Sequence, residues 1–160
     1  MIFVTTGTQD PFDRFIQAID LTLPYMNGVE VVGQVAKSDY QVKNFVVHEF
    51  LSPKDFEECF SRADLIVAHA GMGTIISALV KEKPILVMPR LAKFGEQRND
   101  HQLATAMRFD KLGYINVAYD EVELMHKLKT IQIGPLKPMF AINDHASKEL
   151  ISSLSNFINL

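Results

Sequence analysis

The sequence contains little of what several protein classes depend on. Its 160 residues include one cysteine, Cys59, so no disulfide can form within the chain. No apolar run approaches the ~20 residues that a membrane-spanning helix requires, and no charged segment with a cleavage site precedes an apolar stretch. We therefore expect a cytoplasmic protein, which would meet a membrane only through another protein or an amphipathic surface.

The chain also lacks a large excess of charge of either sign. The 16 basic and 19 acidic side chains give a formal net charge of −3 and are dispersed along the chain. This pattern excludes the basic patch that is typical of nucleic-acid-binding proteins. There is no Asp-x-Asp pair and no cluster of His, Cys and Asp residues at metal-ligand spacing, so no metal is expected.

What the sequence does contain is an alternation of short apolar runs with segments of helical periodicity. A length of 160 residues suits one domain with a substantial core. The alternation predicts a doubly wound, parallel α/β sheet of the Rossmann type over residues 1–160, with helices in the gaps, one of them at 120–129. Six strands are expected, at residues 1–5, 29–35, 45–50, 65–68, 85–88 and 114–117.

Two helices have recognisable start signals. Asp10 precedes Pro11 and Ser52 precedes Pro53, which suits an N-cap followed by proline at the first helical position. The second of these helices carries Cys59 on its buried face. We expect packing there rather than chemistry, because no basic neighbour in the sequence would lower the pKa of the thiol.

The end of the chain is set apart from the expected sheet. Residues 134–138 are rich in proline and glycine and indicate a linker before a last helix at 144–159. That helix has an apolar stripe at 3.6-residue spacing. We favour packing on its own domain for most of the stripe, while residues 139–160 could also dock a second subunit.

The most informative stretch is residues 64–74. A buried strand runs into Gly71 and Gly73, which precede a helix predicted at residues 75–81. Such a turn lets the backbone approach an anion closely, and the free N–H groups of the helix's first turn point toward it. Phosphate is therefore the first ligand to consider, although the pattern alone slightly favours a plain tight turn.

A second polar segment follows the next strand along the chain. Residues 90–100 form a polar loop, after which His101 and Gln102 open another helix. Both segments follow the carboxyl ends of parallel strands, and ligands of open α/β sheets bind at that edge. We therefore expect phosphate-type and sugar-type hydrogen-bonding groups to meet at one site.

Together these motifs resemble a known family. The segments His69-Ala70-Gly71-Met72-Gly73-Thr74, Lys83-Pro84 and Asp100-His101-Gln102 resemble the donor-binding half of GT-B glycosyltransferases of family 28. The resemblance is strongest to small catalytic subunits that act with a membrane-bound partner. One is the soluble subunit of the eukaryotic enzyme that adds the second N-acetylglucosamine to a dolichol-linked chain. Others extend undecaprenyl-linked sugars in bacterial capsule and exopolysaccharide synthesis, and residues 3–12 and 89–102 are most similar to these.

The resemblance implies a UDP-sugar as donor substrate, no metal, and a membrane-anchored partner that supplies the acceptor-side domain at the inner face of the membrane. The acceptor would be a polyprenyl-linked saccharide, and the sugar transferred galactose or glucuronate in β-1,4 linkage. The implied donor-binding residues are Gly7, Thr8, His69, Gly71, Met72, Gly73, Thr74, Ser77, His101 and Gln102. Loop or acceptor contacts are implied for Arg90, Glu96 and Asn99.

Within this implied site, the counterpart of His69 contacts a phosphate, and Gln102 would read the orientation of sugar hydroxyls. His101 has an alternative role as an exposed residue at a helix start capped by Asn99 or Asp100. Ser77 is a departure, because many relatives have an acidic residue there that holds the ribose hydroxyls. A serine can donate one hydrogen bond but cannot grip with two carboxylate oxygens.

No general base is accounted for in this chain, so we expect it on the partner and expect the isolated chain to turn over slowly or not at all. The alternative is a non-catalytic nucleotide-sugar-binding or scaffolding module, which Ser77 and the missing base favour. A dinucleotide-dependent oxidoreductase is disfavoured, because no Gly-x-Gly-x-x-Gly follows the first strand and no acidic residue stands in the ribose position.

Overall fold

Six parallel strands form one sheet in the part of the chain that the structure describes, residues 1–26 and 28–131 of a computed structural model. The linker expected at 134–138, the helix expected at 144–159 and the docking segment 139–160 lie outside these residues. No helix among the described residues is long and apolar enough to cross a bilayer.

The sheet confirms the predicted Rossmann-type architecture, with strand order β3-β2-β1-β4-β5-β6. Every expected strand is present, most of them shorter than predicted. Strands β1 and β5 are buried along their whole length, as expected of parallel strands covered on both faces, whereas the edge strand β3 is exposed. The strands are β1 (Ile2–Thr5), β2 (Val31–Gln34), β3 (Val46–His48), β4 (Leu65–His69), β5 (Ile85–Met88) and β6 (Asn116–Val117).

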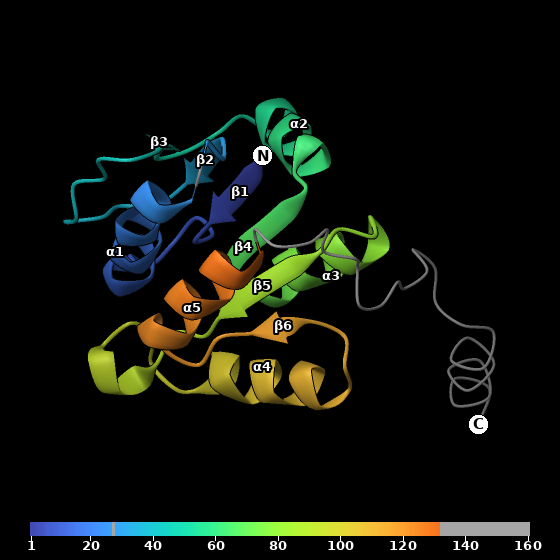
Figure 1. Cartoon of the computed structure of the whole chain (residues 1–160). Helices are drawn as coiled ribbons and strands as arrows, with labels where there is room; N and C mark the ends of the chain where they lie inside the picture. The colour runs from blue at the N-terminus through green and yellow to red at the C-terminus, as the bar shows by residue number, and fades with distance from the viewer. Residues whose placement is uncertain (27, 132–160) are drawn as a thin grey trace, which may run out of the picture.

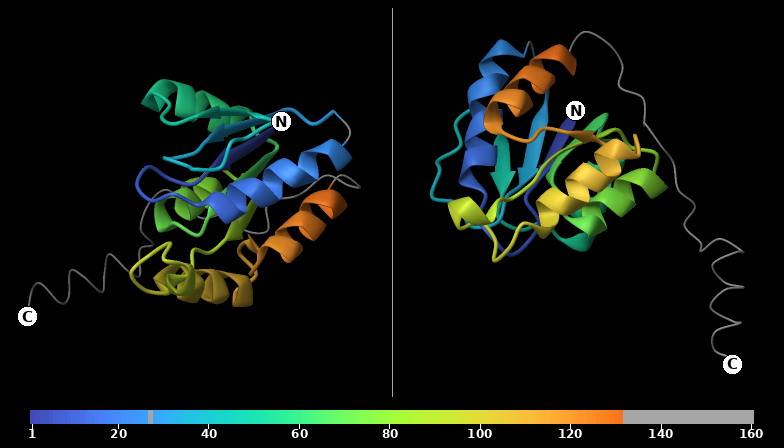
Figure 2. Two further views of the ribbon diagram at one scale, coloured as in Figure 1. Left: turned by 90° about the vertical axis from the view of Figure 1, so that its left-hand side faces the viewer. Right: turned by 90° about the horizontal axis from the view of Figure 1, so that it is seen from below.

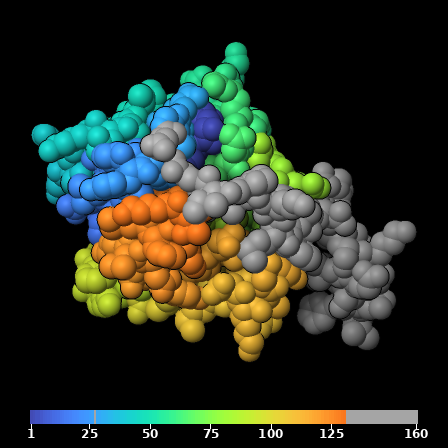
Figure 3. Space-filling view, in the orientation of Figure 1, coloured from blue at the N-terminus to red at the C-terminus, as the bar shows by residue number. Residues whose placement is uncertain are grey.

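Helices cover both faces of the sheet (Figures 1 and 2). On one face lie α1 (Asp13–Thr22) and α5 (Glu121–Ile131), which pack side by side in the space-filling view (Figure 3). On the other lie α2 (Pro53–Arg62), α3 (Met72–Val80) and α4 (His101–Lys111). Short 3-10 turns, η1 (Leu23–Tyr25) and η2 (Ala92–Phe94), complete the connections.

Alternating side chains of β1 show how the two layers of core are built. Val4 belongs to the cluster beneath α1 and α5, while its neighbour Phe3 belongs to the cluster beneath α2 and α3. Phe3 meets Phe60 of α2 edge to face, with ring centroids 6.3 Å apart. Because successive residues of a strand point to opposite faces, each strand contributes to both cores.

The predicted helix starts have different outcomes. Ser52 is the N-cap of α2, and its hydroxyl accepts a hydrogen bond from the Asp55 N–H at 3.2 Å, as predicted. The prediction for Asp10 is wrong, because α1 begins at Asp13 after Phe12 and no side chain caps it. The carbonyl of Asp10 accepts a hydrogen bond from Arg90, which holds residues 6–11 in a loop instead of a helix turn.

The helix predicted at 75–81 also begins earlier than expected, at Met72, with Gly71 as its N-cap. Gly73 and Thr74 therefore belong to the first turn of α3 and not to the preceding turn. Cys59 is partly buried against the core, and burial raises the pKa of its thiol, which is consistent with a packing role.

The strand order also fixes where a ligand can bind. The chain passes from β1 to β2 on one side and from β4 to β5 on the other, so the connections leaving β1 and β4 diverge at their carboxyl ends. Divergence of this kind opens a crevice at the edge of a doubly wound sheet. Both segments that the sequence singled out begin at this edge.

A buried aspartate holds the long connection between β2 and β3. Asp20, which is fully buried on α1, accepts hydrogen bonds from the Tyr40 hydroxyl at 2.8 Å and from the backbone N–H groups of Lys43 and Asn44. These contacts attach residues 40–44 to the helix. No feature of the sequence indicated this role.

Replacement of Asp20 tests that attachment. We expect Asp20→Ala to lower the free energy of unfolding by about 2 kcal/mol, because several donors lose a buried charged acceptor. The exposed Asp39, whose carboxylate holds no partner among the described residues, is the control, and Asp39→Ala should change stability by less than about 0.5 kcal/mol. Urea denaturation of the three proteins measures both values, and equal stability of the two variants would contradict the assignment.

Candidate functional site

A hollow of about 240 Å³ opens at the carboxyl ends of β1 and β4, and we refer to it as the edge pocket. It brings together most of the residues implied as donor-binding. Its lining consists of Thr6, Gly7, Thr8, Gln9, Asp10, His69, Gly71, Gly73, Thr74, Arg90, Gln97 and Gln102. The expected residues outside the lining are Met72, Ser77, Glu96, Asn99 and His101.

A larger hollow of about 680 Å³ lies beside β3, between Val35 and Glu49. Its one basic lining residue, Lys37, is exposed, and no helix begins there. The edge pocket is smaller, but it combines a helix start, a histidine and a buried arginine. Chemistry therefore favours the edge pocket as the functional site.

The N-terminus of α3 forms one wall of the edge pocket. Gly71 is extended, with φ −79° and ψ 130°, and its carbonyl accepts the first helical hydrogen bond, from the Ile75 N–H at 3.1 Å. The N–H groups of Met72, Gly73 and Thr74 have no partner inside the helix, as at every helix start. Together with the positive end of the helix dipole they form a site suited to an anion.

Two glycines allow the backbone to close around His69. A Cβ at Gly71 would lie 2.1 Å from Nε2 of His69, and a Cβ at Gly7 would lie 3.0 Å from its Cε1. Gly7 also has a φ of 81°, which favours glycine. Both glycines are thus required by the imidazole ring, which lies between the loop after β1 and the start of α3.

His69 is held as a neutral imidazole. Its Nδ1 lies 3.4 Å from the carbonyl oxygen of Thr5, which can only accept, so the proton belongs on Nδ1 and Nε2 is left as an acceptor. Burial, followed by the positive charge of Arg90, lowers the pKa of His69 to about 4, and the contact with Thr5 opposes this shift. An anion in the pocket would favour the protonated ring, which donates from both nitrogens.

Arg90 is a buried cation without a carboxylate partner among the described residues. Its side chain is 2% exposed, and Nη2 donates to the carbonyls of Thr6 at 2.8 Å and Asp10 at 2.5 Å. The guanidinium also lies 5.0 Å from the ring centroid of Phe12, while Nε donates to no described residue. Burial lowers the pKa of Arg90, yet an arginine stays charged in proteins. A buried, unpaired charge is costly, and an anionic ligand would compensate it.

Gln102 and His101 open α4 but have different environments. Gln102 is 3% exposed, and its Oε1 accepts a hydrogen bond from the Arg90 N–H at 3.2 Å, which leaves its amide nitrogen to donate into the edge pocket. His101 is exposed, and both its backbone N–H and its Nδ1 contact Oδ1 of Asn99, at 3.2 and 2.6 Å. For His101 the structure shows the alternative arrangement, a capped helix start.

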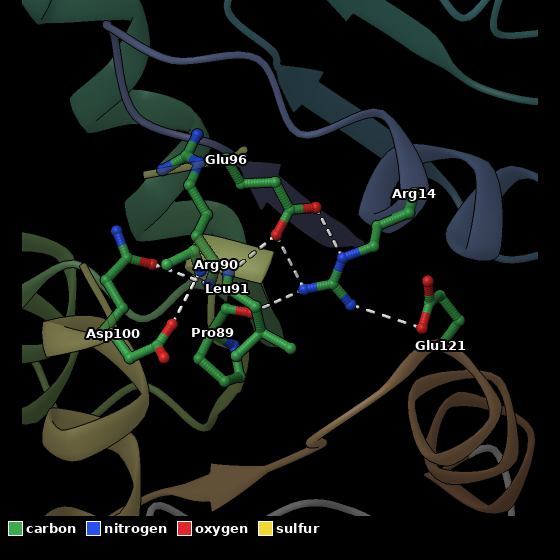
Figure 4. A network of polar contacts seen from close by, with 9 residues as sticks. Arg14, Pro89, Arg90, Leu91, Glu96, Asp100 and Glu121 are labelled. Carbon is green, nitrogen blue, oxygen red and sulfur yellow. Dashed lines mark hydrogen bonds and ion pairs between the residues drawn. The ribbon is translucent and has the colours of Figure 1, made fainter. Parts of the chain in front are cut away.

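Glu96 lies in an ion-paired network beside the pocket (Figure 4). Its two carboxylate oxygens accept hydrogen bonds from Arg14 at 2.6 and 3.0 Å, and one also accepts from the Leu91 N–H at 2.8 Å. Arg14 donates in addition to the Pro89 carbonyl, and its Nη1 lies 3.3 Å from Glu121, an ion pair without hydrogen-bond alignment. Glu96 therefore fixes the loop between β5 and α4.

Sequence reasoning missed several residues of this region. Arg14 lies 82 positions from Glu96, and no local pattern distinguishes it from other charged residues on α1. Gln97 belongs to the polar loop that was expected to contribute, but nothing in the sequence separated it from its neighbours. Among the described residues there is no group of three or more His, Cys, Asp and Glu side chains that could hold a metal ion.

These features define a Rossmann-like α/β domain with a pocket at the carboxyl edge of its sheet that is lined by a helix start, a histidine and a buried arginine. Residues 1–154 match the glycosyltransferase family 28 C-terminal domain, and the chain belongs to this family.

Its relatives include a subunit of a eukaryotic transferase. The chain is 27% identical over 124 residues to the human UDP-N-acetylglucosamine transferase subunit ALG13, covering 71% of this chain and 10% of the human protein. It is 33% identical over 88 residues to ALG13 of Saccharomyces cerevisiae, covering 54% of this chain and 41% of the yeast protein. The matches thus span less than half the length of these two relatives.

Solved structures show the same fold. An NMR structure of ALG13 superposes with a TM-score of 0.61 at 20% identity, covering 96% of this chain and 93% of the other. The crystal structure of Acinetobacter baumannii MurG gives a TM-score of 0.60 at 16% identity, covering 97% of this chain and 49% of that one. Os79 from O. sativa in complex with UDP gives 0.59 at 15% identity, with 81% and 31% covered. At these sequence identities, the similarity to the three solved structures shows a shared fold.

A methyl group at Gly71 tests the closeness of the histidine. We expect Gly71→Ala to destabilise the protein by about 1–3 kcal/mol, because the added Cβ would displace the ring of His69. Gly73 is the matched control: a Cβ there meets nothing within 4 Å, so Gly73→Ala should not lower stability. Thermal unfolding measures both, and a Gly71→Ala protein as stable as the Gly73→Ala protein would contradict the observed packing.

The neutral state of His69 predicts a dependence of stability on pH. The folded-state pKa of His69, about 4, lies below the usual 6.5, so the folded protein resists protonation of this ring. The contribution of neutral His69 to stability is complete above pH 6.5 and is lost as the pH falls toward 4. Between pH 7 and pH 5 this histidine should remove about 2 kcal/mol. His69→Gln should lose correspondingly less over that interval in urea titrations. An unchanged pH profile in His69→Gln would show that the ring titrates normally.

Proposed function

We propose that this chain is the donor-binding subunit of a heteromeric glycosyltransferase that uses a UDP-sugar. The observation that carries the proposal is the edge pocket, where the start of α3, neutral His69 and unpaired Arg90 converge. A diphosphate supplies the negative charge that the helix start and Arg90 favour, and it would favour the protonated form of His69, which donates from both ring nitrogens. The names of the relatives support the same ligand, since ALG13 is a UDP-N-acetylglucosamine transferase subunit and Os79 was solved with UDP.

The pocket suits the departure of a nucleoside diphosphate. In glycosyl transfer, an acceptor hydroxyl oxygen forms a bond to the anomeric carbon, and the bond from that carbon to the β-phosphate oxygen breaks. The electron pair of that bond leaves with UDP, and the hydroxyl proton passes to a base. Donors that are already aligned at the start of α3 stabilise the developing charge without reorganisation. Arg90 contributes a full positive charge close by.

The partner and the acceptor belong to the same proposal. A membrane-anchored subunit would supply the acceptor-side domain and the general base, and would hold the chain at the inner face of the membrane. The acceptor would be a polyprenyl-linked saccharide, and the process capsule or exopolysaccharide synthesis with β-1,4 transfer of galactose or glucuronate. Support for the bacterial type comes from residues 3–12 and 89–102, whereas the ALG13 relatives are named for N-acetylglucosamine.

One observation favours a second candidate, a nucleotide-sugar-binding module without catalysis. Ser77 lies on α3 outside the pocket lining, so the acidic ribose contact of many relatives has no replacement at that position. Both candidates bind UDP, and only the first transfers sugar. Transfer to a lipid-linked acceptor, with and without the partner, separates them.

We expect the purified chain to bind UDP and to transfer sugar only when the partner is present, because the base is on the partner. Arg90→Met should weaken UDP binding by about tenfold or more through loss of a charge-assisted contact, measured by calorimetry. Arg98→Met, on the exposed part of the same loop, should bind UDP normally. Full activity of the chain alone would contradict the division between two subunits, and absence of UDP binding would refute the proposed site.

A further inference from the structure

We propose that Gln97 reads the sugar of the donor, its amide oxygen accepting a hydrogen bond from a sugar hydroxyl. This inference rests on the proposed function and adds a specificity-determining residue to it. Gln97 is in the polar loop between β5 and α4, and it lines the edge pocket together with His69, Arg90 and Gln102.

The first observation is an unsatisfied acceptor. Oε1 of Gln97 is buried, and no described residue donates a hydrogen bond to it. Buried amide oxygens are nearly always paired, because removal from water without a partner is unfavourable. A hydroxyl of a molecule in the pocket would provide the missing donor.

The second observation is that the loop is held in place on both sides of this glutamine (Figure 4). Glu96, its neighbour, is 11% exposed and paired with Arg14, and it also accepts a hydrogen bond from the Leu91 N–H. Oδ1 of Asp100 accepts from the Ala92 N–H at 2.7 Å. These contacts connect the beginning and the end of the loop, so the position of Gln97 is fixed before any ligand arrives.

The third observation concerns which part of a nucleotide sugar can satisfy each group. Two residues of the pocket lining each carry a buried group without a partner among the described residues: Nε of Arg90, which donates, and Oε1 of Gln97, which accepts. Ionised phosphate oxygens only accept hydrogen bonds, so a diphosphate can pair with Arg90 but not with Gln97. A sugar hydroxyl donates as well as accepts. The ribose of UDP also carries hydroxyls that donate. We assign the contact to the transferred sugar, and this assignment predicts that Gln97 distinguishes a UDP-sugar from UDP.

Gln102 complements this arrangement. Its own Oε1 is occupied by the Arg90 N–H, so its amide nitrogen is the group left to donate. One glutamine then accepts from the sugar and the other donates to it. A pair of this kind fixes the direction of a hydroxyl, which is the property that differs between epimeric hexoses.

The experiment compares the affinity for UDP with the affinity for UDP-sugar in the full chain. Calorimetry with UDP-galactose, UDP-glucose, UDP-N-acetylglucosamine and UDP-glucuronate first identifies the tightest donor for the unmodified protein. Gln97→Met keeps the length of the side chain and removes the amide, whereas Gln97→Glu keeps the accepting oxygens. Gln41→Met, an exposed glutamine beside β3, is the control for the substitution itself.

We expect Gln97→Met to weaken binding of the preferred UDP-sugar by about tenfold while UDP affinity stays unchanged. Gln41→Met should stay within about threefold of the unmodified protein for UDP-sugar. Gln97→Glu adds a negative charge that repels the diphosphate, so it should weaken UDP and UDP-sugar alike and keep the ratio of the two affinities within about threefold of the unmodified protein. Donors with a single hydroxyl replaced by fluorine then locate the contact, because one of them should lose no further affinity when combined with Gln97→Met.

Three outcomes would overturn the inference. Equal weakening of UDP and UDP-sugar in Gln97→Met would mean that the residue supports the pocket as a whole. A ratio of UDP-sugar affinity to UDP affinity that falls equally in Gln97→Met and Gln97→Glu would mean that the amide nitrogen makes the contact. No change in either variant would mean that Gln97 does not meet the sugar. If the unmodified protein fails to bind UDP, the proposed function fails instead, which keeps the two failures distinguishable.

Discussion

The guanidinium of Arg90 is the interaction on which the shape of the edge pocket depends. It extends from the end of β5 to the carbonyls of Thr6 and Asp10, in the loop that follows β1. This link keeps the loop open and prevents α1 from starting at Pro11. Burial lowers the pKa of His69, and the charge of Arg90 lowers it further, so the buried cation contacts the backbone of one segment and also favours the neutral state of its neighbour. A protein with an unpaired positive charge buried in a pocket is less stable when the pocket is empty than when an anion occupies it, as expected of a binding site.

Two layers of support surround this cation. Beneath it, the rings of Phe12 and Phe15 stack 5.0 Å apart and bury the base of the loop. Beside it, Arg14 connects α1 to the loop after β5 and to α5, so elements distant in the sequence are joined at one point. Because the Arg14 and Glu96 side chains are only 13% and 11% exposed, solvent screens their attraction less than on an open surface. The loop that presents Gln97 is consequently part of the rigid framework.

The fold was largely predictable, because its determinants are local in the sequence. Apolar runs such as residues 85–88 correspond to buried strands, and Ser52 with Pro53 marks a helix start that the structure confirms. The position of the pocket was predictable from glycines such as Gly71, because few residues allow the backbone to lie so close to a neighbouring group. Asp10 was misassigned because a hydrogen bond from Arg90, 80 positions away, outweighs a local capping preference. Arg14 and Gln97 were missed for the same reason: their roles depend on partners, or on the absence of partners, that only the folded chain brings together.

In the proposed site, phosphate recognition and sugar recognition would be carried by different chemistry. The α3 start and Arg90 offer donors and positive charge, which suit any diphosphate, so they provide affinity without selectivity. Gln97 in the loop between β5 and α4 and Gln102 in the first turn of α4 offer neutral amides, one accepting and one donating, which would respond to the direction of a hydroxyl. With the two proposed roles on different segments, substitutions near Gln97 and Gln102 would change the sugar preference while the phosphate contacts stay intact. The Arg14–Glu96 pair is then the structural condition for such change, because it holds the backbone of the loop independently of the side chains that face the ligand.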